Sequence, residues 1–238
     1  MSHDRTPEQI QQLAALNNAA WCVAMWRAHG LEVERTLGMV VCRGAPPRFY
    51  PNAVTIEPLA SAEAQAEWLA ALAVKGGARG VSVKDSFQTL NLRDYGYGRL
   101  FDASWIRRPG GMAAALPDLD WRLVEEAEQL AEWETAWRGD DPAAEPDTFR
   151  PALIQDKTAG ILAGWRDETL AAGCVMAPTA NVVGLANVFG DYAEVVNAAV
   201  QAFPVTDLVG YERDDELQKA LACGFEPIGG LKVWATWA

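Results

Sequence analysis

The hydrophobic positions of the 238-residue chain change their spacing at regular intervals, which predicts helices that alternate with strands. In the second half, apolar residues recur at helical spacing over three stretches, at about 123–138, 190–203 and 214–224. Apolar runs bounded by turn residues predict five strands, at 160–165, 170–177, 182–189, 207–212 and 228–237. This alternation predicts an α/β fold with a mixed sheet.

The first half of the chain shows the same order of elements. The pattern predicts a helix around 20–30, a hairpin at 31–43, a strand at 52–58, a helix at 61–75 and a strand at 80–86. A short helix and a last strand follow. We therefore expect the two halves to share one architecture.

Residue spacing supports an internal repeat. Gly96 and Gly224 are 128 residues apart, and so are Glu63 and Asp191. The second half also holds about 17 extra residues, an acidic and proline-rich insertion at 139–155 that reads as a loop. The spacing predicts an N-terminal half at 1–110, a linker at 111–118 and a C-terminal half at 119–238.

Composition places the chain among globular proteins. Half of its residues are hydrophobic, enough to bury a core. No apolar run reaches the roughly 18 residues of a membrane helix, and the first residues are polar, without an apolar signal segment. We expect a cytoplasmic protein that does not bind membranes.

The charge distribution limits the classes of partner. The net charge of −12 disfavours nucleic-acid binding, whose affinity comes largely from the neutralisation of phosphates. Residues 118–147 hold eleven acids and only two bases. Such a stretch is either a solvated helix face or a surface that attracts a cationic substrate.

Nothing in the spacing of cysteine and histidine predicts a metal site. The four cysteines and two histidines are scattered singly, without a metal-binding pair. Each cysteine lies in an apolar stretch, so we expect buried thiols and neither disulfides nor bound metal.

The order helix–hairpin–strand–helix–strand–helix–strand resembles the fold of the GNAT (N-acetyltransferase) superfamily. The residues that carry the resemblance are "ELQKALACGFEPIGGLKVW" at 216–234, an amphipathic helix followed by Gly-Phe and a short strand, and "LVGYE" before them. The resemblance covers about 119–238 well and about 6–108 more weakly. It implies two GNAT-like α/β units in tandem, the N-terminal one more degenerate.

The resemblance also implies where acetyl-CoA would bind. In the family, the fourth and fifth strands splay apart around the thioester, and a glycine-rich loop at the next helix start holds the pyrophosphate. The matching positions here are Asn187, Val188, Phe189 and Gly190. Asn187 and the neighbouring backbone would polarise the thioester carbonyl, or Asn187 would only complete a bulge or turn.

The pyrophosphate loop itself departs from the family pattern. Gly190 is the only glycine at this helix start, and Asp191 stands where phosphate would lie. An aspartate there predicts an N-cap that occupies the free N–H groups and repels phosphate. In the first half Ser61 predicts a similar cap, without any glycine. Both helix starts are therefore predicted to be poor phosphate sites.

The catalytic positions are depleted as well. The family's general-acid tyrosine would fall at Ala220 in the second half and at Leu92 in the first. Glu212 is the candidate general base, or else a solvated acid at a strand end. Tyr211 would donate a proton to the leaving thiolate, or else only cover the sheet.

Two functions therefore remain in view. The first is an acetyl-CoA-dependent N-acetyltransferase for an amine that the sequence does not identify, with the second half as the active one. The second is a catalytically degenerate module that binds a ligand or a partner without CoA.

Overall fold

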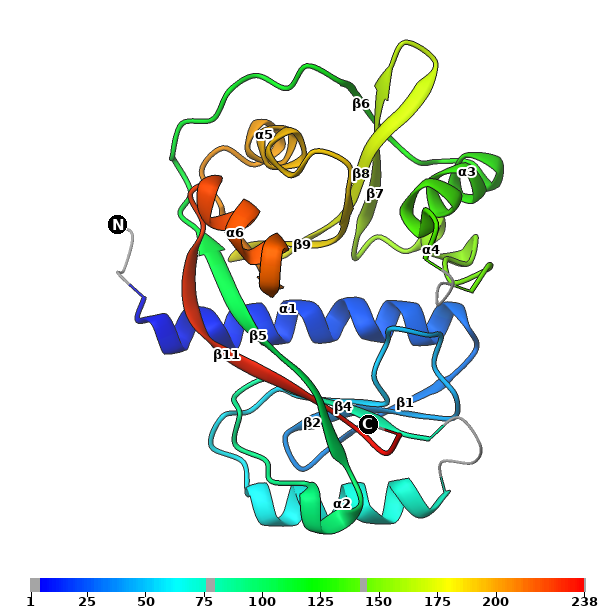
Figure 1. Ribbon diagram of the computed structural model, residues 1–238, viewed down its shortest axis with the longest axis vertical. Coiled ribbons are helices and arrows are strands. Elements are labelled where there is room, and N and C mark those ends of the chain that lie inside the picture. Colours follow the sequence, from blue (N-terminus) through cyan, green and yellow to red (C-terminus); the bar gives the residue numbers. More distant parts are fainter. Residues whose placement is uncertain (1–4, 76–79, 142–144, 238) are drawn as a thin grey trace. The chain divides into compact units, whose positions relative to one another are not determined.

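The computed structural model describes residues 5–75, 80–141 and 145–237. The chain is a mixed α/β protein, as predicted, and forms two compact units (Figure 1). Unit 1 comprises Met1–Trp105 and Ile228–Ala238, and unit 2 comprises Ile106–Pro227. In the described part of the chain, every helix is too short or too polar to span a bilayer.

Unit 1 contains a sheet with the strand order β1-β2-β3-β4-β11-β5. Its elements are α1 (Pro7–Ala28), β1 (Glu32–Thr36), β2 (Met39–Arg43), β3 (Ala53–Thr55), α2 (Ala62–Lys75), β4 (Ser82–Asp85), the 3-10 helix η2 (Arg93–Tyr95), β5 (Gly98–Arg108) and β11 (Glu226–Ala235). Strands β3 and β4 are parallel, whereas β1, β2 and β3 form an antiparallel meander. The last residues of β5 belong to unit 2, as do the first two of β11.

Helix α1 begins at Pro7, well before the helix predicted around 20–30, because residues 6–9 form a strong helix start. Thr6 and Gln9 form a capping box, and Pro7 stands at the first helical position, where its missing N–H costs nothing. On the sheet, alternate residues of β2 and β4 enter a core that includes Met39, Val83 and Leu69. This core accounts for the apolar runs of the first half.

Unit 2 contains a sheet with the strand order β5-β10-β9-β8-β7-β6. Its further elements are β6 (Asp120–Leu123), α3 (Ala127–Arg138), α4 (Ala152–Gln155), β7 (Gly160–Arg166), β8 (Thr169–Pro178), β9 (Val182–Phe189), α5 (Tyr192–Ala202), β10 (Asp207–Glu212) and α6 (Asp214–Ala222). Strands β6 to β9 are successively antiparallel, and β9 and β10 are parallel. One face of this sheet packs against α5 and α6 through a core that includes Val183, Leu208 and Val195.

Most elements of the second half match the prediction, with three differences, the first being that the helix predicted from about 123 begins at Ala127. The short strand β6 was not predicted, because its four residues carry too little pattern to be recognised before they pair with β7. The predicted loop at 139–155 contains the single helical turn α4, in which Leu153 is buried. Residues 142–144 of that insertion lie outside the described residues.

The compact units divide the chain differently from the repeat. Residues 228–235, predicted to close the C-terminal half, belong to unit 1, where Val233 and Trp234 pair with Lys84 and Val83 of β4. Strand β5, predicted to close the N-terminal half, enters unit 2 from Ile106 onward. The halves 1–110 and 119–238 stay a prediction from residue spacing, and their bounds differ from those of units 1 and 2.

Candidate functional site

Strands β9 and β10 part at the centre of the unit 2 sheet. Their parallel pairing is registered at Val182–Asp207, Val183–Leu208 and Gly184–Val209. The register ends there, although β9 continues to Phe189 and β10 to Glu212. We call residues 185–189 and 210–212 the β9/β10 fork. Beyond Gly184 and Val209 the two strands no longer pair with each other.

A β-bulge shapes the β9 arm of the fork. On its other side β9 pairs with β8, and the register shifts between Ala186–Val175 and Phe189–Gly173. Asn187 lies in this bulge with φ of 52°, in the left-handed region that asparagine tolerates better than most residues. The bulge thus explains the backbone conformation of Asn187. Its role toward a thioester carbonyl stays a prediction.

The side chains of Val188 and Phe189 have packing partners within unit 2. Val188 packs against the unit 2 core. The ring of Phe189 meets Trp133 of α3 edge-on, with 5.3 Å between ring centroids. Any contact of these two residues with a ligand would therefore be made mainly by their backbone.

Gly190 is required by close packing. Its φ is 80°, and a Cβ atom there would lie 2.4 Å from the carbonyl oxygen of Ala171. A side chain is therefore excluded by the neighbouring strand β8 whether or not a ligand binds.

Asp191 caps α5, as the sequence predicts. Its carboxylate accepts hydrogen bonds from the backbone N–H groups of Ala193, at 2.9 Å, and of Glu194, at 3.3 Å. Free N–H groups of a helix start are what would hold a pyrophosphate, and here two of them are already bonded to a negative group. The residues at the α5 start therefore do not fit the pyrophosphate of CoA in this arrangement.

Glu212 ends the β10 arm of the fork and is partly buried. Burial raises the pKa of its carboxyl group to about 7, and the nearby Glu216 acts in the same direction. The hydrogen bond from Tyr192 and the charge of Lys219 oppose that rise. A carboxylate with a pKa near neutrality has the chemistry of a general base.

Tyr192, which the sequence analysis did not single out, contacts this carboxylate. It is the first residue of α5, it is 5% exposed, and its Oη donates to Glu212 Oε1 at 3.3 Å. Burial and the charge of Glu212 raise the pKa of the Tyr192 phenol, which therefore stays a hydrogen-bond donor. Its signal in the sequence is weak, because it lies 20 residues from Glu212 and meets it only through the fold.

The other predicted catalytic positions are distributed differently. Tyr211 is half-buried and precedes Glu212 on β10, so the two side chains point to opposite faces of the strand. Ala220 is fully buried in the unit 2 core, in the same cluster as Tyr192 and Phe225. Leu92 is buried in the core of unit 1. Neither position supplies a phenol.

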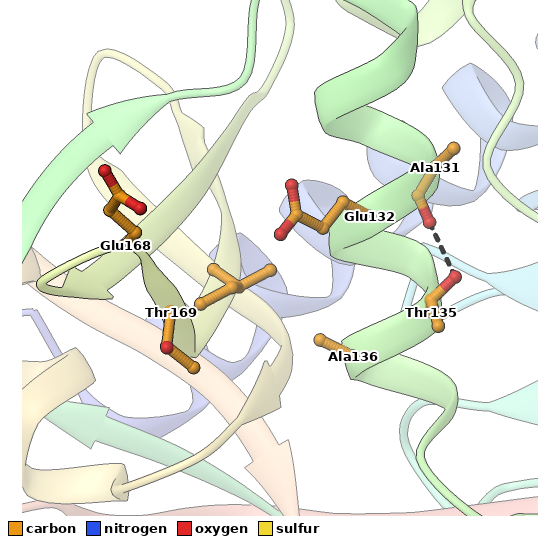
Figure 2. A pocket seen from close by; sticks show the side chains of 7 residues that line it. Ala131, Glu132, Thr135, Ala136, Glu168 and Thr169 are labelled. Carbon is orange, nitrogen blue, oxygen red and sulfur yellow. Dashed lines mark hydrogen bonds between the residues drawn. The ribbon is translucent and has the colours of Figure 1, made fainter.

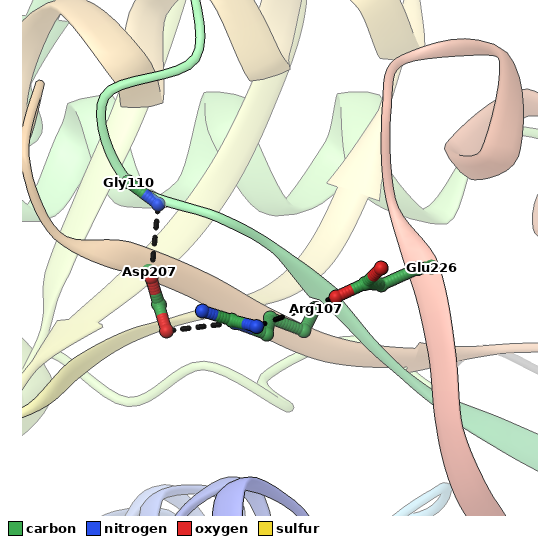
Figure 3. Close-up of polar contacts among 4 residues, drawn as sticks. All are labelled: Arg107, Gly110, Asp207 and Glu226. Atoms are coloured by element: carbon green, nitrogen blue, oxygen red, sulfur yellow. Dashed lines mark hydrogen bonds and ion pairs between the residues drawn. The ribbon is translucent and has the colours of Figure 1, made fainter. Parts of the chain in front are cut away.

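A polar clamp holds the paired end of the fork (Figure 3). Arg107 Nε lies 2.8 Å from Asp207 Oδ2, and its Nη1 lies 3.3 Å from Glu226 Oε1. The N–H of Gly110 donates to Asp207 Oδ1 at 2.8 Å. Because Asp207 is the first residue of β10, these contacts fix that strand against the end of β5 and leave its last residues to diverge from β9.

Unit 2 has a further depression away from the fork. A groove of about 580 Å³ lies between α3 and the β7–β8 turn. Figure 2 shows Glu132 and Glu168 on its two sides. Both glutamates are exposed, and Glu132 belongs to the acidic stretch noted in the sequence. In residues 5–75, 80–141 and 145–237, no three His, Cys, Asp or Glu side chains gather closely enough to hold a metal ion.

Comparisons with known proteins identify the fold. No family model matches the sequence, and no curated protein matches it. Among solved structures, a GCN5-related N-acetyltransferase from Kribbella flavida aligns with a TM-score of 0.57 and 16% identity, over 91% of this chain and 94% of its own. A GNAT-family protein from Novosphingobium aromaticivorans aligns with a TM-score of 0.53 and 13% identity, over 93% of this chain and 97% of its own.

A conserved protein of unknown function from Bacteroides thetaiotaomicron also aligns, with a TM-score of 0.51 and 13% identity, over 99% of this chain and 93% of its own. The predicted resemblance is thus confirmed for the fold, which is that of GCN5-related N-acetyltransferases. At such low identities the likeness extends to the fold alone.

Proposed function

We propose that this protein transfers an acyl group to an amine, with the β9/β10 fork of unit 2 as the reaction site and Glu212 as the general base. The observation that carries the proposal is the position of Glu212 at the end of the fork with a pKa raised to about 7. The shared fold supports this class of reaction by analogy.

The proposed role of Glu212 is to take a proton from the amine. An ammonium group must lose a proton before its nitrogen can attack an acyl carbon, and a carboxylate with a pKa near 7 accepts that proton readily at neutral pH. In this scheme the backbone of 187–190 lines the acyl-donor side and the thiol leaves as thiolate, whereas Tyr211 faces the other side of β10 from Glu212 and takes no part in the step. Acetyl-CoA is the proposed donor, by analogy with the fold.

Unit 2 is proposed as the active unit because the corresponding strands of unit 1 are tied together. Strands β3 and β4 pair at Ala53–Val83 and Val54–Lys84, and the N–H of Ser86 then donates to Thr55 Oγ1 at 2.8 Å. This bond links the two chain segments just beyond their last paired residues, which is the position at which β9 and β10 of unit 2 stop pairing.

The test is a titration of the full chain with acetyl-CoA and, separately, with a short acetyl thioester that lacks the pyrophosphate. Calorimetry measures binding, and release of free thiol in the presence of an amine panel measures transfer. Binding of either thioester together with loss of transfer in Glu212→Gln would support the proposal. No binding of either donor at millimolar concentration would overturn it.

A second candidate function is favoured by one specific observation. The Asp191 carboxylate occupies two N–H groups at the α5 start, and this supports a module that binds a ligand or partner without CoA. That function is supported if neither donor binds while the fold stays intact by circular dichroism.

A further inference from the structure

We infer that Tyr192 is a positioning residue for Glu212, holding one carboxylate oxygen so that the other one faces the reacting amine. For its catalytic meaning the inference rests on the proposed acyl transfer. Its structural content, the control of the Glu212 carboxylate by the Tyr192 hydroxyl, can be measured without any substrate.

The geometry gives the two carboxylate oxygens different surroundings. Tyr192 Oη donates to Oε1 at 3.3 Å. Within the described part of the chain, Oε2 accepts no hydrogen bond. A carboxylate held at one oxygen loses rotational freedom, and its second oxygen is left to accept the proton. In that step the N–H bond of the ammonium breaks and an O–H bond forms at Oε2.

The Tyr192 ring is itself fixed in place. Its side chain is 5% exposed and belongs to the unit 2 core. Its ring lies edge-on to Phe225, with 6.4 Å between centroids. The helix start that carries it is capped by Asp191 through Ala193 and Glu194. A donor held on a rigid element orients its partner better than one on a loop.

The charged groups that act on Glu212 come from two elements. Tyr192 lies on α5, and Glu216 and Lys219 lie on α6, where they pair with each other at 2.7 Å. Tyr192 donates to the ionised form, and a hydrogen bond to the ionised form favours it. Loss of the hydroxyl should therefore make Glu212 harder to ionise.

The experiment compares Tyr192→Phe with the unmodified full chain by carboxyl-carbon NMR titration of Glu212. Loss of a hydrogen bond to a charged group should raise the pKa of Glu212 by about one unit. Glu212→Gln assigns the resonance by removing it. Tyr97→Phe is the matched control, because it deletes another buried hydroxyl, one that donates to Leu69 O at 2.9 Å in unit 1. That variant should leave the Glu212 titration unchanged.

A shift no larger than that of Tyr97→Phe would overturn the inference. If Tyr192→Phe does not fold, incorporation of 3-fluorotyrosine tests the same contact with the opposite sign. A more acidic phenol donates more strongly, so the pKa of Glu212 should fall, and an unchanged value would again contradict the inference.

Kinetics separate this inference from the proposed function. If acyl transfer is observed, the acidic limb of the kcat/KM profile should move upward with the Glu212 titration in Tyr192→Phe, by the same amount. If no thioester binds at all, the proposed function fails, and the NMR titration still decides whether Tyr192 controls Glu212.

Discussion

One side chain of the β9/β10 fork, the carboxylate of Glu212, is in an environment that serves no evident packing need. A glutamate at a strand end usually reaches into water, and it then costs the fold little. Glu212 is instead partly buried, with its pKa raised to about 7. Retaining a carboxylate there makes folding less favourable at neutral pH, which is a common property of functional sites.

This cost can be measured as a pH-dependent stability. The folded-state pKa of Glu212 is higher than the ordinary value of 4.5, so the unfolded chain binds fewer protons between pH 4.5 and about 7. The free energy of unfolding should fall across that window and stay lower above it. Glu212→Gln removes this pH-dependent contribution to the free energy of unfolding. The difference in free energy of unfolding between the variant and the unmodified protein should therefore increase, in favour of the variant, by roughly 3 kcal/mol between pH 4.5 and 8.

Amide hydrogen exchange of β9 and β10 measures this difference within unit 2. Glu168→Gln, at an exposed carboxylate of the same unit, is the control. An equal response of both variants would show that Glu212 does not titrate in the fold as described.

Asp191 decides whether the α5 start can accept an anion. Asp191→Gly removes the negative cap and frees the N–H groups of Ala193 and Glu194. If a pyrophosphate binds there, affinity for acetyl-CoA should rise about tenfold, measured by calorimetry. The loss of the cap should cost only a few tenths of a kcal/mol, because glycine is tolerated at N-caps.

Asp191→Asn separates charge from capping, because asparagine keeps an acceptor without the negative charge. An affinity raised only in the glycine variant would assign the effect to the freed N–H groups. Unchanged affinity in both variants would show that a pyrophosphate does not lie at the α5 start.

Gly190 and Gly111 make a matched pair for testing why a glycine follows the β9 arm of the fork. Their φ angles are 80° and 81°, yet a Cβ at Gly190 would meet Ala171 at 2.4 Å, whereas nothing lies within 4 Å at Gly111. Gly111→Ala should therefore cost about 1 kcal/mol for its backbone conformation alone. Gly190→Ala should cost at least about 2 kcal/mol more.

Thermal unfolding and urea titration check this comparison. Similar decreases in the free energy of unfolding of the two variants would mean that β8 shifts at little cost. Packing would then not explain the glycine at 190. In that case a close approach of a ligand would be the remaining explanation for glycine at this position.

Helices and strands were largely predictable from the sequence, whereas their mutual geometry was not. The apolar run of β9, the cap at Asp191 and the amphipathic α5 all rest on local pattern, and the structure has them where expected. The parting of β9 from β10 depends on which residues pair across the sheet. The local pattern of apolar residues does not specify this pairing. For the same reason the contact of Tyr192 with Glu212 was not predicted.

The comparison of β3 and β4 with β9 and β10 shows how one order of elements gives two different outcomes. In unit 1, Ser86 O accepts from Gln11 Nε2 at 2.9 Å and from Trp105 Nε1 at 2.8 Å. Together with the bond from Ser86 N to Thr55, these contacts bind the strand end on both its donor and its acceptor side. The end of β4 is therefore held by side-chain contacts at the position where β9 and β10 of unit 2 stop pairing.

The compact units of the chain differ in their bounds from the halves predicted from residue spacing. Residues 228–235 come last in the sequence, yet they supply the strand between β4 and β5 in unit 1. Trp234 of that strand is buried in the unit 1 core. Residue spacing does not tell which unit a strand joins. The placement of β11 in unit 1 could therefore not be predicted from spacing.

The place of β11 in unit 1 leads to a prediction about the isolated N-terminal half, residues 1–110. A fragment of residues 1–110 lacks β11, so β4 loses the partner that pairs with Ser82–Asp85, and the core loses Trp234. Because an uncovered strand edge and an incomplete core both oppose folding, this fragment should show weak amide dispersion in NMR and no cooperative thermal transition. A fusion of 226–238 to its C-terminus through a flexible linker should restore both, and a fusion with Leu231, Val233 and Trp234 all changed to serine should not. Cooperative unfolding of the unfused fragment would mean that the N-terminal half folds without the last strand.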